Sequence, residues 1–173
     1  MNSGGLTTFN MTNVNTSDDW SYYSSFCVES SVYFTPGSEY IVKSVVDYVD
    51  VNNDYLSNKT KWLYATYMTD PSNYNADLAQ SAVWWLENEP DGYKVAWTTF
   101  FQQATGLDKT NGYDFTSILS DWDIKIINLT DINSNNIQSQ MVGSLNPVPE
   151  PTTLVLFGMG LLGIAYISNK KKT

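Results

Sequence analysis

Residues 77–87 read D-L-A-Q-S-A-V-W-W-L-E and mark the point where the hydrophobic pattern of the chain becomes helical. Leu78, Ala82 and Trp85 recur at helical spacing, which predicts an amphipathic helix with a broad apolar face. Asn75 is the expected N-cap, and Asp77 in the first turn suits the helix dipole. A helical segment is therefore expected in the middle of the chain.

One further helix is predicted on each side of this stretch. Before it, Trp62 and Ala65 begin a helical pattern that should end at Asp70, because the next residue is proline. After it, the apolar residues of 93–104 repeat at helical spacing; Pro90 should start that helix and Gly106 should end it.

Strand patterns flank the helical segment. Residues 5–14, 20–31 and 39–49 precede it, and residues 122–127 and 138–145 follow it, with a polar turn expected at 128–136. Strands, then helices, then closing strands predict an α+β domain. We expect an antiparallel β-sandwich or open barrel with an insertion of about three helices, spanning residues 1–145.

The end of the chain has three ordered parts: N-P-V-P-E-P-T-T from residue 146, an apolar run over 154–167, and a basic end containing Lys170, Lys171 and Lys172. The run is shorter than the roughly 20 residues that span a bilayer comfortably. The lysines act as a stop and favour the cytoplasmic side. The pattern predicts a proline-rich linker at 146–152 and a C-terminal transmembrane helix with a basic tail at 153–173.

This end resembles the PEP-CTERM sorting signal of bacterial exported proteins, with Pro149, Glu150 and Pro151 as the sorting motif. The resemblance implies a temporary membrane anchor that is removed by its partner, an exosortase, before the protein reaches the cell surface or extracellular matrix. The alternative is an ordinary C-terminal anchor. The first ten residues lack a basic and an apolar region, which predicts that Met1 is not the natural start, unless the chain stays in the cytoplasm.

Composition excludes several functions. Without the three terminal lysines, the chain has six lysines and 18 acidic residues. The resulting net charge of −12 repels nucleic acid. The chain has no histidine, so a histidine-dependent triad is impossible, and we expect no enzyme, no metal and no cofactor. Aromatic residues make up 14% and charged residues only 16%, which is typical of a secreted β-rich surface protein. Cys27 is the only cysteine, so no internal disulfide forms.

A cysteine thiol and a glutamine carboxamide in contact can lose ammonia and form a thioester. Cys27 lies in the strand pattern and Gln80 on the helix, and Phe26, Ala82 and Trp84 are the expected shield against water. Gln80 to Trp84 matches the Q-x-A-x-W part of the T-Q-x-A-x-W motif of bacterial thioester domains, although Ala79 stands in place of threonine.

The resemblance to thioester domains implies adhesion, in a biofilm or another surface setting, with Cys27 as leaving group and Gln80 as acyl donor to an amine or hydroxyl on another surface. A late strand containing residues 138–141 is familiar from PEP-CTERM proteins as well. The plainer interpretation is a buried cysteine and a glutamine that satisfies the backbone. The protein would then be a non-covalent structural or carbohydrate-binding matrix component.

Three weaker candidates remain. Glu87, Glu89 and Asp91 could bind Ca²⁺ or act as a carboxylate pair, but an acidic solvated turn is the better interpretation. The loop from Asp131 is rich in oxygen ligands but also has ordinary turn chemistry. Four tryptophans could form a sugar-stacking platform, namely Trp62, Trp84, Trp85 and Trp97. Three of the four lie on predicted apolar helix faces and should therefore belong to the core.

Overall fold

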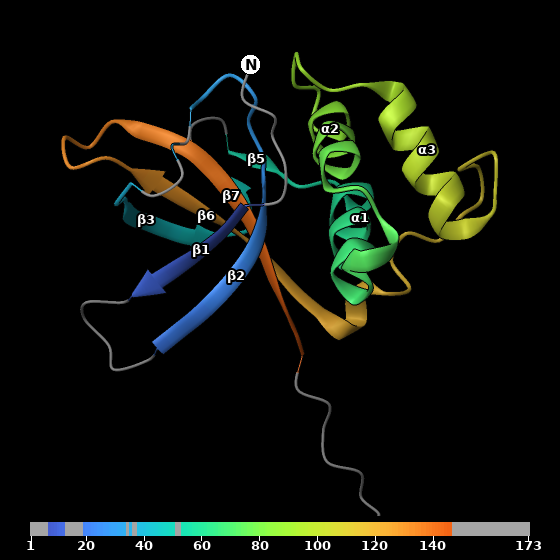
Figure 1. Ribbon diagram of the computed structural model, residues 1–173, viewed down its shortest axis with the longest axis horizontal. Helices are drawn as coiled ribbons and strands as arrows, with labels where there is room; N and C mark the ends of the chain where they lie inside the picture. The colour runs from blue at the N-terminus through green and yellow to red at the C-terminus, as the bar shows by residue number, and fades with distance from the viewer. Residues whose placement is uncertain (1–6, 13–18, 34, 36–37, 51–52, 147–173) are drawn as a thin grey trace, which may run out of the picture.

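The computed structural model describes residues 7–12, 19–33, 35, 38–50 and 53–146, and of residues 7–12 and 19–24 it describes the backbone alone. Five strands form one antiparallel sheet in the order β1-β2-β7-β6-β3 (Figure 1). They are β1 Thr7–Thr12, β2 Asp19–Cys27, β3 Ile41–Val46, β6 Trp122–Thr130 and β7 Asn136–Leu145. A small ribbon pairs β4, Tyr48–Val49, with β5, Asp54–Tyr55.

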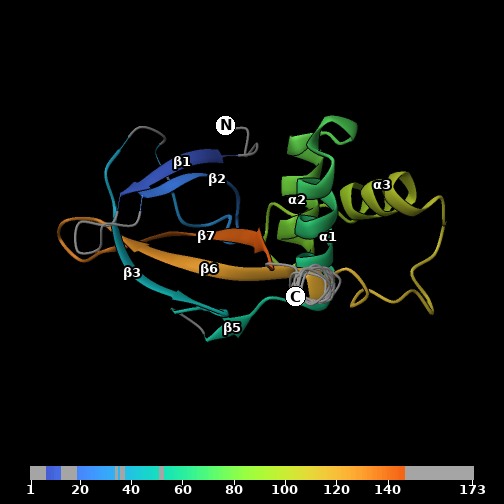
Figure 2. The same ribbon diagram turned by 90° about the horizontal axis from the view of Figure 1, so that it is seen from below.

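Three helices follow β5 and precede β6: α1 Asn58–Thr69, α2 Ala76–Leu86 and α3 Lys94–Thr105. Two short 3-10 turns, η1 Pro71–Asn73 and η2 Leu119–Asp121, complete the order. Figures 1 and 2 show α1 and α2 next to one end of the sheet and α3 on their outer side. The predicted α+β class, with antiparallel strands and three inserted helices, is confirmed.

The described residues form one large sheet and not two stacked ones, so the predicted sandwich is wrong, and the sheet does not close into a barrel. The sheet remains open, with β1 and β3 at its edges. The helices take the place of a second sheet, because apolar residues of β2, β6 and β7 pack against them in one core. Strand patterns predict that a face is buried, and they do not say which element covers it.

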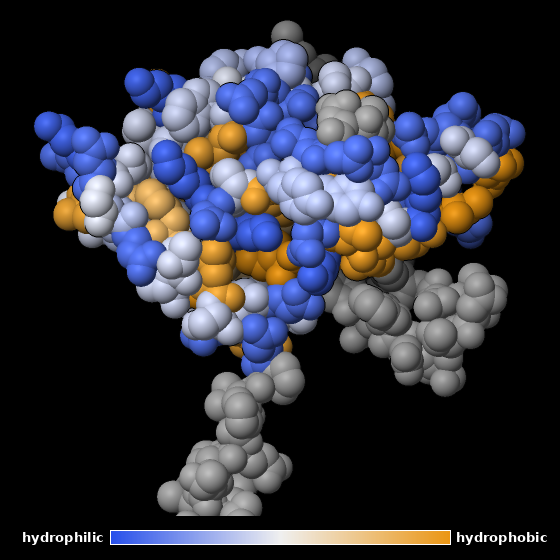
Figure 3. Space-filling view, turned by 180° about the vertical axis from the view of Figure 1, so that it is seen from behind, coloured by the Kyte–Doolittle hydropathy of each residue, from blue (hydrophilic) through white to orange (hydrophobic). Residues whose placement is uncertain are grey.

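Aromatic rings fill the core between the helices and the sheet. Phe26 of β2 is fully buried and meets Tyr67 of α1 edge-on, with ring centroids 5.0 Å apart. Tyr64 lies so close to β7 that a Cβ on Gly143 would be 2.7 Å from its ring. Only glycine leaves room for this ring against the strand. Hydrophilic residues dominate the face seen in Figure 3, with apolar ones showing between them.

The helix boundaries follow the caps, with one exception. The Asn75 side chain accepts a 2.8 Å hydrogen bond from the Leu78 N–H and caps α2, and Gly106 ends α3 with a φ of 72°. Pro90 does not start α3, which begins at Lys94. The intervening residues instead fold back along the second half of α2. The Tyr93 N–H donates to the Ser81 carbonyl, and a Cβ on Gly92 would be 2.1 Å from the Trp85 nitrogen.

Three strand predictions differ from the structure. The strand expected at 20–31 ends at Cys27. The strand expected at 39–49 divides at Asp47 into β3 and β4, because the chain turns there around the buried Asn128 side chain. Strand β6 continues to Thr130, beyond the start of the expected turn, since Leu129 and Thr130 pair with β3.

Among the described residues, no helix is both long and apolar enough to cross a membrane. The membrane helix predicted at 153–173, the sorting motif and the terminal lysines lie outside the described residues.

Candidate functional site

Cys27 is the last residue of β2, and Gln140 of β7 is its partner across the strands. The Cys27 residue is only 6% exposed, and Gln140 is fully buried. The site therefore lies inside the fold at the end of β2, and its side chains are withdrawn from bulk water.

The structure brings Gln80 against Cys27, through the main chain of the cysteine. The Cys27 N–H donates to Oε1 of Gln80 at 2.8 Å, and Nε2 of Gln80 donates to the Cys27 carbonyl at 2.7 Å. Gln80 is fully buried on α2. Its carboxamide thus occupies the position that a neighbouring strand would take beside the end of β2.

This arrangement brings the cysteine and Gln140 side chains together. The N–H and C=O of Cys27 point to Gln80 and away from β7, whereas the next N–H, that of Val28, donates to the Ser139 carbonyl at 3.0 Å. Cys27 and Gln140 therefore form a non-hydrogen-bonded pair, the kind in which facing side chains approach most closely.

The sulfur of Cys27 lies against the Gln140 carboxamide. Sγ is 3.4 Å from Nε2 and 3.8 Å from Oε1 of Gln140. Ser25, on the same face of β2 two residues earlier, donates its hydroxyl to that Oε1 at 2.8 Å. No motif in the sequence predicts Gln140 as a site residue, because facing positions follow from the strand register, whereas the Q-x-A-x-W motif indicates the helix.

The three residues expected to shield the site lie in different environments. Phe26 points to the opposite face of β2 from Cys27, because side chains alternate along a strand, so it packs in the core and away from the sulfur. Ala82 is fully buried on α2. Trp84 is half-buried, and its buried indole N–H has no hydrogen-bond partner among the described residues.

Two carboxylates fix the segment that leaves β2. Oε2 of Glu29 accepts a hydrogen bond from the Ser139 N–H at 3.0 Å. Oε2 of Glu89, just after α2, accepts from the Ser30 N–H at 2.8 Å and from its hydroxyl at 3.1 Å. Together with Gln80, these bonds hold residues 27–30 between β7 and the helical segment.

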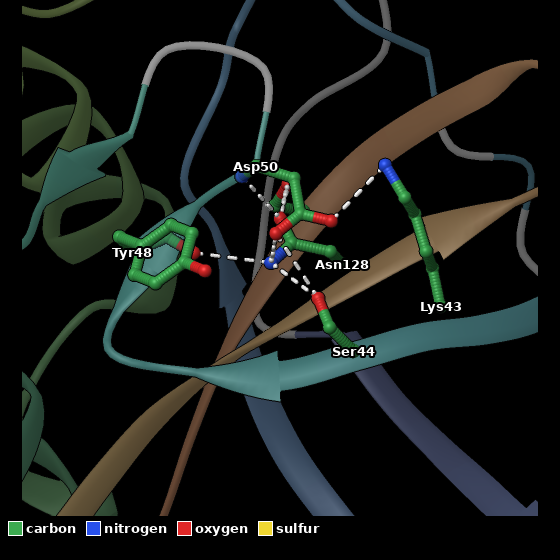
Figure 4. A network of polar contacts seen from close by, with 6 residues as sticks. Lys43, Ser44, Tyr48, Asp50 and Asn128 are labelled. Carbon is green, nitrogen blue, oxygen red and sulfur yellow. Dashed lines mark hydrogen bonds and ion pairs between the residues drawn. The ribbon is translucent and has the colours of Figure 1, made fainter.

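A polar network around Asn128 of β6 supports β7 on the side opposite to β2. The Ser139 hydroxyl donates to Oδ1 of Asn128 at 3.0 Å, and Nδ2 of Asn128 donates to the Tyr48 carbonyl at 3.0 Å and the Ser44 hydroxyl at 3.1 Å (Figure 4). Lys43 and Asp50 form an ion pair at the solvent-exposed edge of this network, with 3.1 Å between Nζ and Oδ2. Buried networks of this kind restrict a strand to one arrangement.

The acidic residues after α2 do not converge on one site. Glu87 accepts hydrogen bonds from the Thr60 hydroxyl and the Ser57 N–H of the α1 start, whereas Glu89 turns to Ser30. Burial raises the pKa of Glu87, against the opposing effect of those two hydrogen bonds. No cluster of three potential metal ligands occurs within the described ranges.

The other candidates have structural roles. Asp131 accepts hydrogen bonds from the Asn133 and Asn135 N–H groups at 2.8 Å each, which is turn chemistry, and the bonds from Asn135 chiefly lower the pKa of Asp131. Trp62 and Trp97 are buried, with ring centroids 6.0 Å apart in an edge-to-face contact. They belong to the core and cannot stack on a sugar.

Comparison with known proteins identifies one feature. The PEP-CTERM protein-sorting motif matches residues 147–171. The motif implies export of the chain, membrane anchoring before processing and an exosortase as the processing partner. No curated protein and no solved structure matches the chain.

Proposed function

We propose that this exported protein, once an exosortase has released it from its anchor, attaches covalently to another surface through a thioester between Cys27 and Gln140. The observation that carries the proposal is the contact of the Cys27 sulfur with the Gln140 carboxamide, 3.4 Å from Sγ to Nε2 in a buried site. The T-Q-x-A-x-W resemblance around Gln80 supports the same class of chemistry.

Gln140 is the better acyl donor of the two glutamines. Both hydrogen-bonding edges of the Gln80 carboxamide are engaged by the Cys27 main chain. If Gln80 reacted with the sulfur, its Nε2 would depart, and the buried Cys27 carbonyl would lose its partner at a cost of about 1–3 kcal/mol. For Gln140 the departing Nε2 gives up only a longer bond to the Gln138 carbonyl, 3.4 Å against 2.7 Å for the bond from Gln80 to Cys27, and the sulfur already contacts the Gln140 carboxamide.

The chemistry is one acyl transfer in two steps. Sγ of Cys27 bonds to Cδ of Gln140, the bond from Cδ to Nε2 breaks, and the nitrogen leaves as ammonia with the thiol proton. An amine or hydroxyl of the target then attacks Cδ, displaces the thiol of Cys27 and remains joined to Gln140. Each molecule reacts once, so the protein is a cross-linker without turnover.

Burial makes such a bond long-lived and selective. Both reacting side chains are almost completely withdrawn from water, which protects the thioester from hydrolysis. A nucleophile must enter a site in which Cys27 is 6% exposed. A slender primary amine at the end of a flexible chain fits this access better than a branched one.

The test is mass spectrometry of the full chain purified in detergent. The intact protein should be lighter than its sequence mass by one ammonia, and methylamine should open the thioester and leave a methylamide on the acyl donor. Fragmentation should place the methylamide on Gln140. A methylamide on Gln80 would move the acyl donor to α2, and the full mass with a titratable thiol would remove the thioester altogether.

Matched variants complete the test. Cys27→Ala and Gln140→Leu should both have the full mass, and neither should incorporate methylamine. Gln138→Leu is the control, because Gln138 lies two residues away on the same strand and donates to the Glu29 carbonyl, not to the sulfur. It should keep the loss of ammonia.

The alternative is a non-covalent structural or carbohydrate-binding matrix protein. It predicts that Cys27→Ala attaches to its surface as well as wild type does. The exposed aromatic residues available to it in the described ranges are Tyr33, Tyr55 and Tyr93, which are 81%, 63% and 64% exposed. Replacing them should then abolish attachment.

A further inference from the structure

A third side chain contacts the reacting groups. Ser25 is fully buried, and its hydroxyl donates to Oε1 of Gln140 over 2.8 Å. Ser25 and Cys27 are both on β2 and face the same side of the sheet, so the serine meets the oxygen of the carboxamide while the cysteine meets its nitrogen side.

From this geometry we infer that Ser25 is a catalytic residue that stabilises negative charge on the acyl oxygen of Gln140 during both formation and opening of the thioester. The inference rests on the proposed Cys27 and Gln140 pair. It adds an activating group that no motif in the sequence indicates, since serine is common in this chain and its partner is fixed only by the strand register.

The charge arises in both steps at the same atom. When Sγ adds to Cδ, the carbon becomes tetrahedral and Oε1 carries the negative charge; the charge is lost when ammonia departs. When a target amine adds to the thioester, Oε1 becomes negative again until the thiolate of Cys27 leaves and takes the proton from the amine. A hydroxyl that already donates to Oε1 strengthens its bond in each transition state without moving.

Burial strengthens the stabilisation of negative charge on Oε1 by the Ser25 hydroxyl. Both Ser25 and Gln140 are fully buried, so water does not compete for Oε1 and the hydrogen bond acts in a medium of low polarity. Gln80 and the Asn128 network hold the two strands in register on either side. The serine, the sulfur and the carboxamide are therefore held in a fixed arrangement before any target arrives.

The experiment measures both rates in Ser25→Ala. The full chain in detergent is unfolded, reduced and refolded, and the loss of ammonia is followed by intact mass; the thioester that forms is then opened with methylamine. Removing one oxyanion donor typically slows a reaction about 10²- to 10³-fold. We expect both rates to fall by at least about 10-fold, and by similar factors, because one oxygen carries the charge in both steps.

The two rates separate catalysis from alignment. If Ser25 only held the carboxamide beside the sulfur, formation would slow and opening by methylamine would not, since opening needs no alignment of Cys27. Opening of Ser25→Ala at the wild-type rate would therefore overturn the inference. A wild-type protein that never loses ammonia would instead refute the thioester itself, so the two failures are distinguishable.

Thr130→Val is the matched control, because Thr130 is a buried hydroxyl residue of the same sheet that lies on β6 opposite Asn136, away from Gln140 and from the Asn128 network. It should form and open the thioester at nearly wild-type rates. If Ser25→Ala fails to fold, Ser25→Thr and Ser25→Val serve as the test pair, since they share shape and strand preference and differ by the hydroxyl. Opening at equal rates in Thr and Val would then overturn the inference.

Discussion

Two glutamines beside one cysteine have different tasks at the level of single residues. Gln80 bonds the main chain of Cys27 on both sides, and Gln140 meets the sulfur. The sequence predicted a glutamine near Cys27 from a helix motif, and helical spacing suffices to predict which face of α2 carries Gln80. The partner of the sulfur depends on how β2 pairs with β7. Cys27 and Gln140 are 113 positions apart in the sequence, so folding alone brings them together.

Replacing Gln80 tests its task as a main-chain partner. Gln80→Ala removes both hydrogen bonds of the Gln80 carboxamide to the buried main chain of Cys27, so we expect a loss of about 2–4 kcal/mol in the free energy of unfolding. The measurement is urea unfolding in a Cys27→Ala background, where no covalent link contributes. Gln102→Ala, at an exposed helix position, is the control and should change stability by less than about 0.5 kcal/mol. Equal effects of the two substitutions would contradict the assignment.

Glu87 gives a prediction about pH. Burial raises the pKa of Glu87 in the folded state, so the folded protein binds this proton more tightly than the unfolded chain does. The resulting stabilisation is fully present below the pKa of the unfolded chain and is lost as the pH rises through the folded pKa. Glu87→Gln carries no charge and keeps an oxygen for Thr60 and Ser57, so it should be more stable than wild type at pH 7.

The measurement is the Tm of both proteins from pH 7 down to pH 4. The advantage of Glu87→Gln should shrink steadily as the carboxyl group of the wild type takes up its proton. A Tm difference that stays constant across this range would show that burial of the charge is not the cause.

Helix and strand boundaries show where local sequence is sufficient. The sequence predicts the start of α2 at Asn75 and the end of α3 at Gly106, because a cap acts through bonds to its own helix. The start of α3 is not predicted correctly from Pro90, because residues 87–93 pack back on α2 and a local sequence rule does not describe that contact. The division of the third predicted strand likewise depends on Asn128, about 80 residues later.

The α2 cap is directly testable. Asn75→Ala removes the acceptor of the Leu78 N–H and should destabilise the protein by about 1 kcal/mol, measured by urea unfolding. Asn58→Ala, at the exposed first residue of α1, is the matched control and should have a much smaller effect. If Asn58→Ala costs as much, the loss reflects asparagine removal in general and not the cap.

At the scale of the whole molecule, the sequence predicted the class of the fold and the sorting signal but not the layers. Periodicity distinguishes strands from helices, and it does not say whether a buried sheet face meets another sheet or a group of helices. Here the aromatic residues of α1 pack on the sheet, and those of α3 pack against α1 from its outer side (Figure 1). The tail is different, because its three parts act in order along the chain and need no tertiary context.

The sorting motif predicts how the whole chain is processed. In a host with an exosortase, Glu150→Ala should leave the protein in the membrane at its full length, because Glu150 lies in the matched sorting motif, which implies an exosortase as the processing partner. Immunoblotting of membrane and surface fractions for a C-terminal epitope measures the uncleaved form. Glu39→Ala, an exposed acidic residue of the body, should be processed normally. Equal cleavage of both variants would show that Glu150 is not read.

Strand β7 carries Gln140 and ends at Leu145, directly before the matched sorting motif. If the target becomes joined to Gln140, the mechanical path from target to processed C-terminus runs along the last part of one strand. Tension would bypass the helices and the other strands, because the bond to Cys27 is broken once the target is attached. The rest of the fold would serve to prepare the bond, and it would carry no load after the protein is tethered.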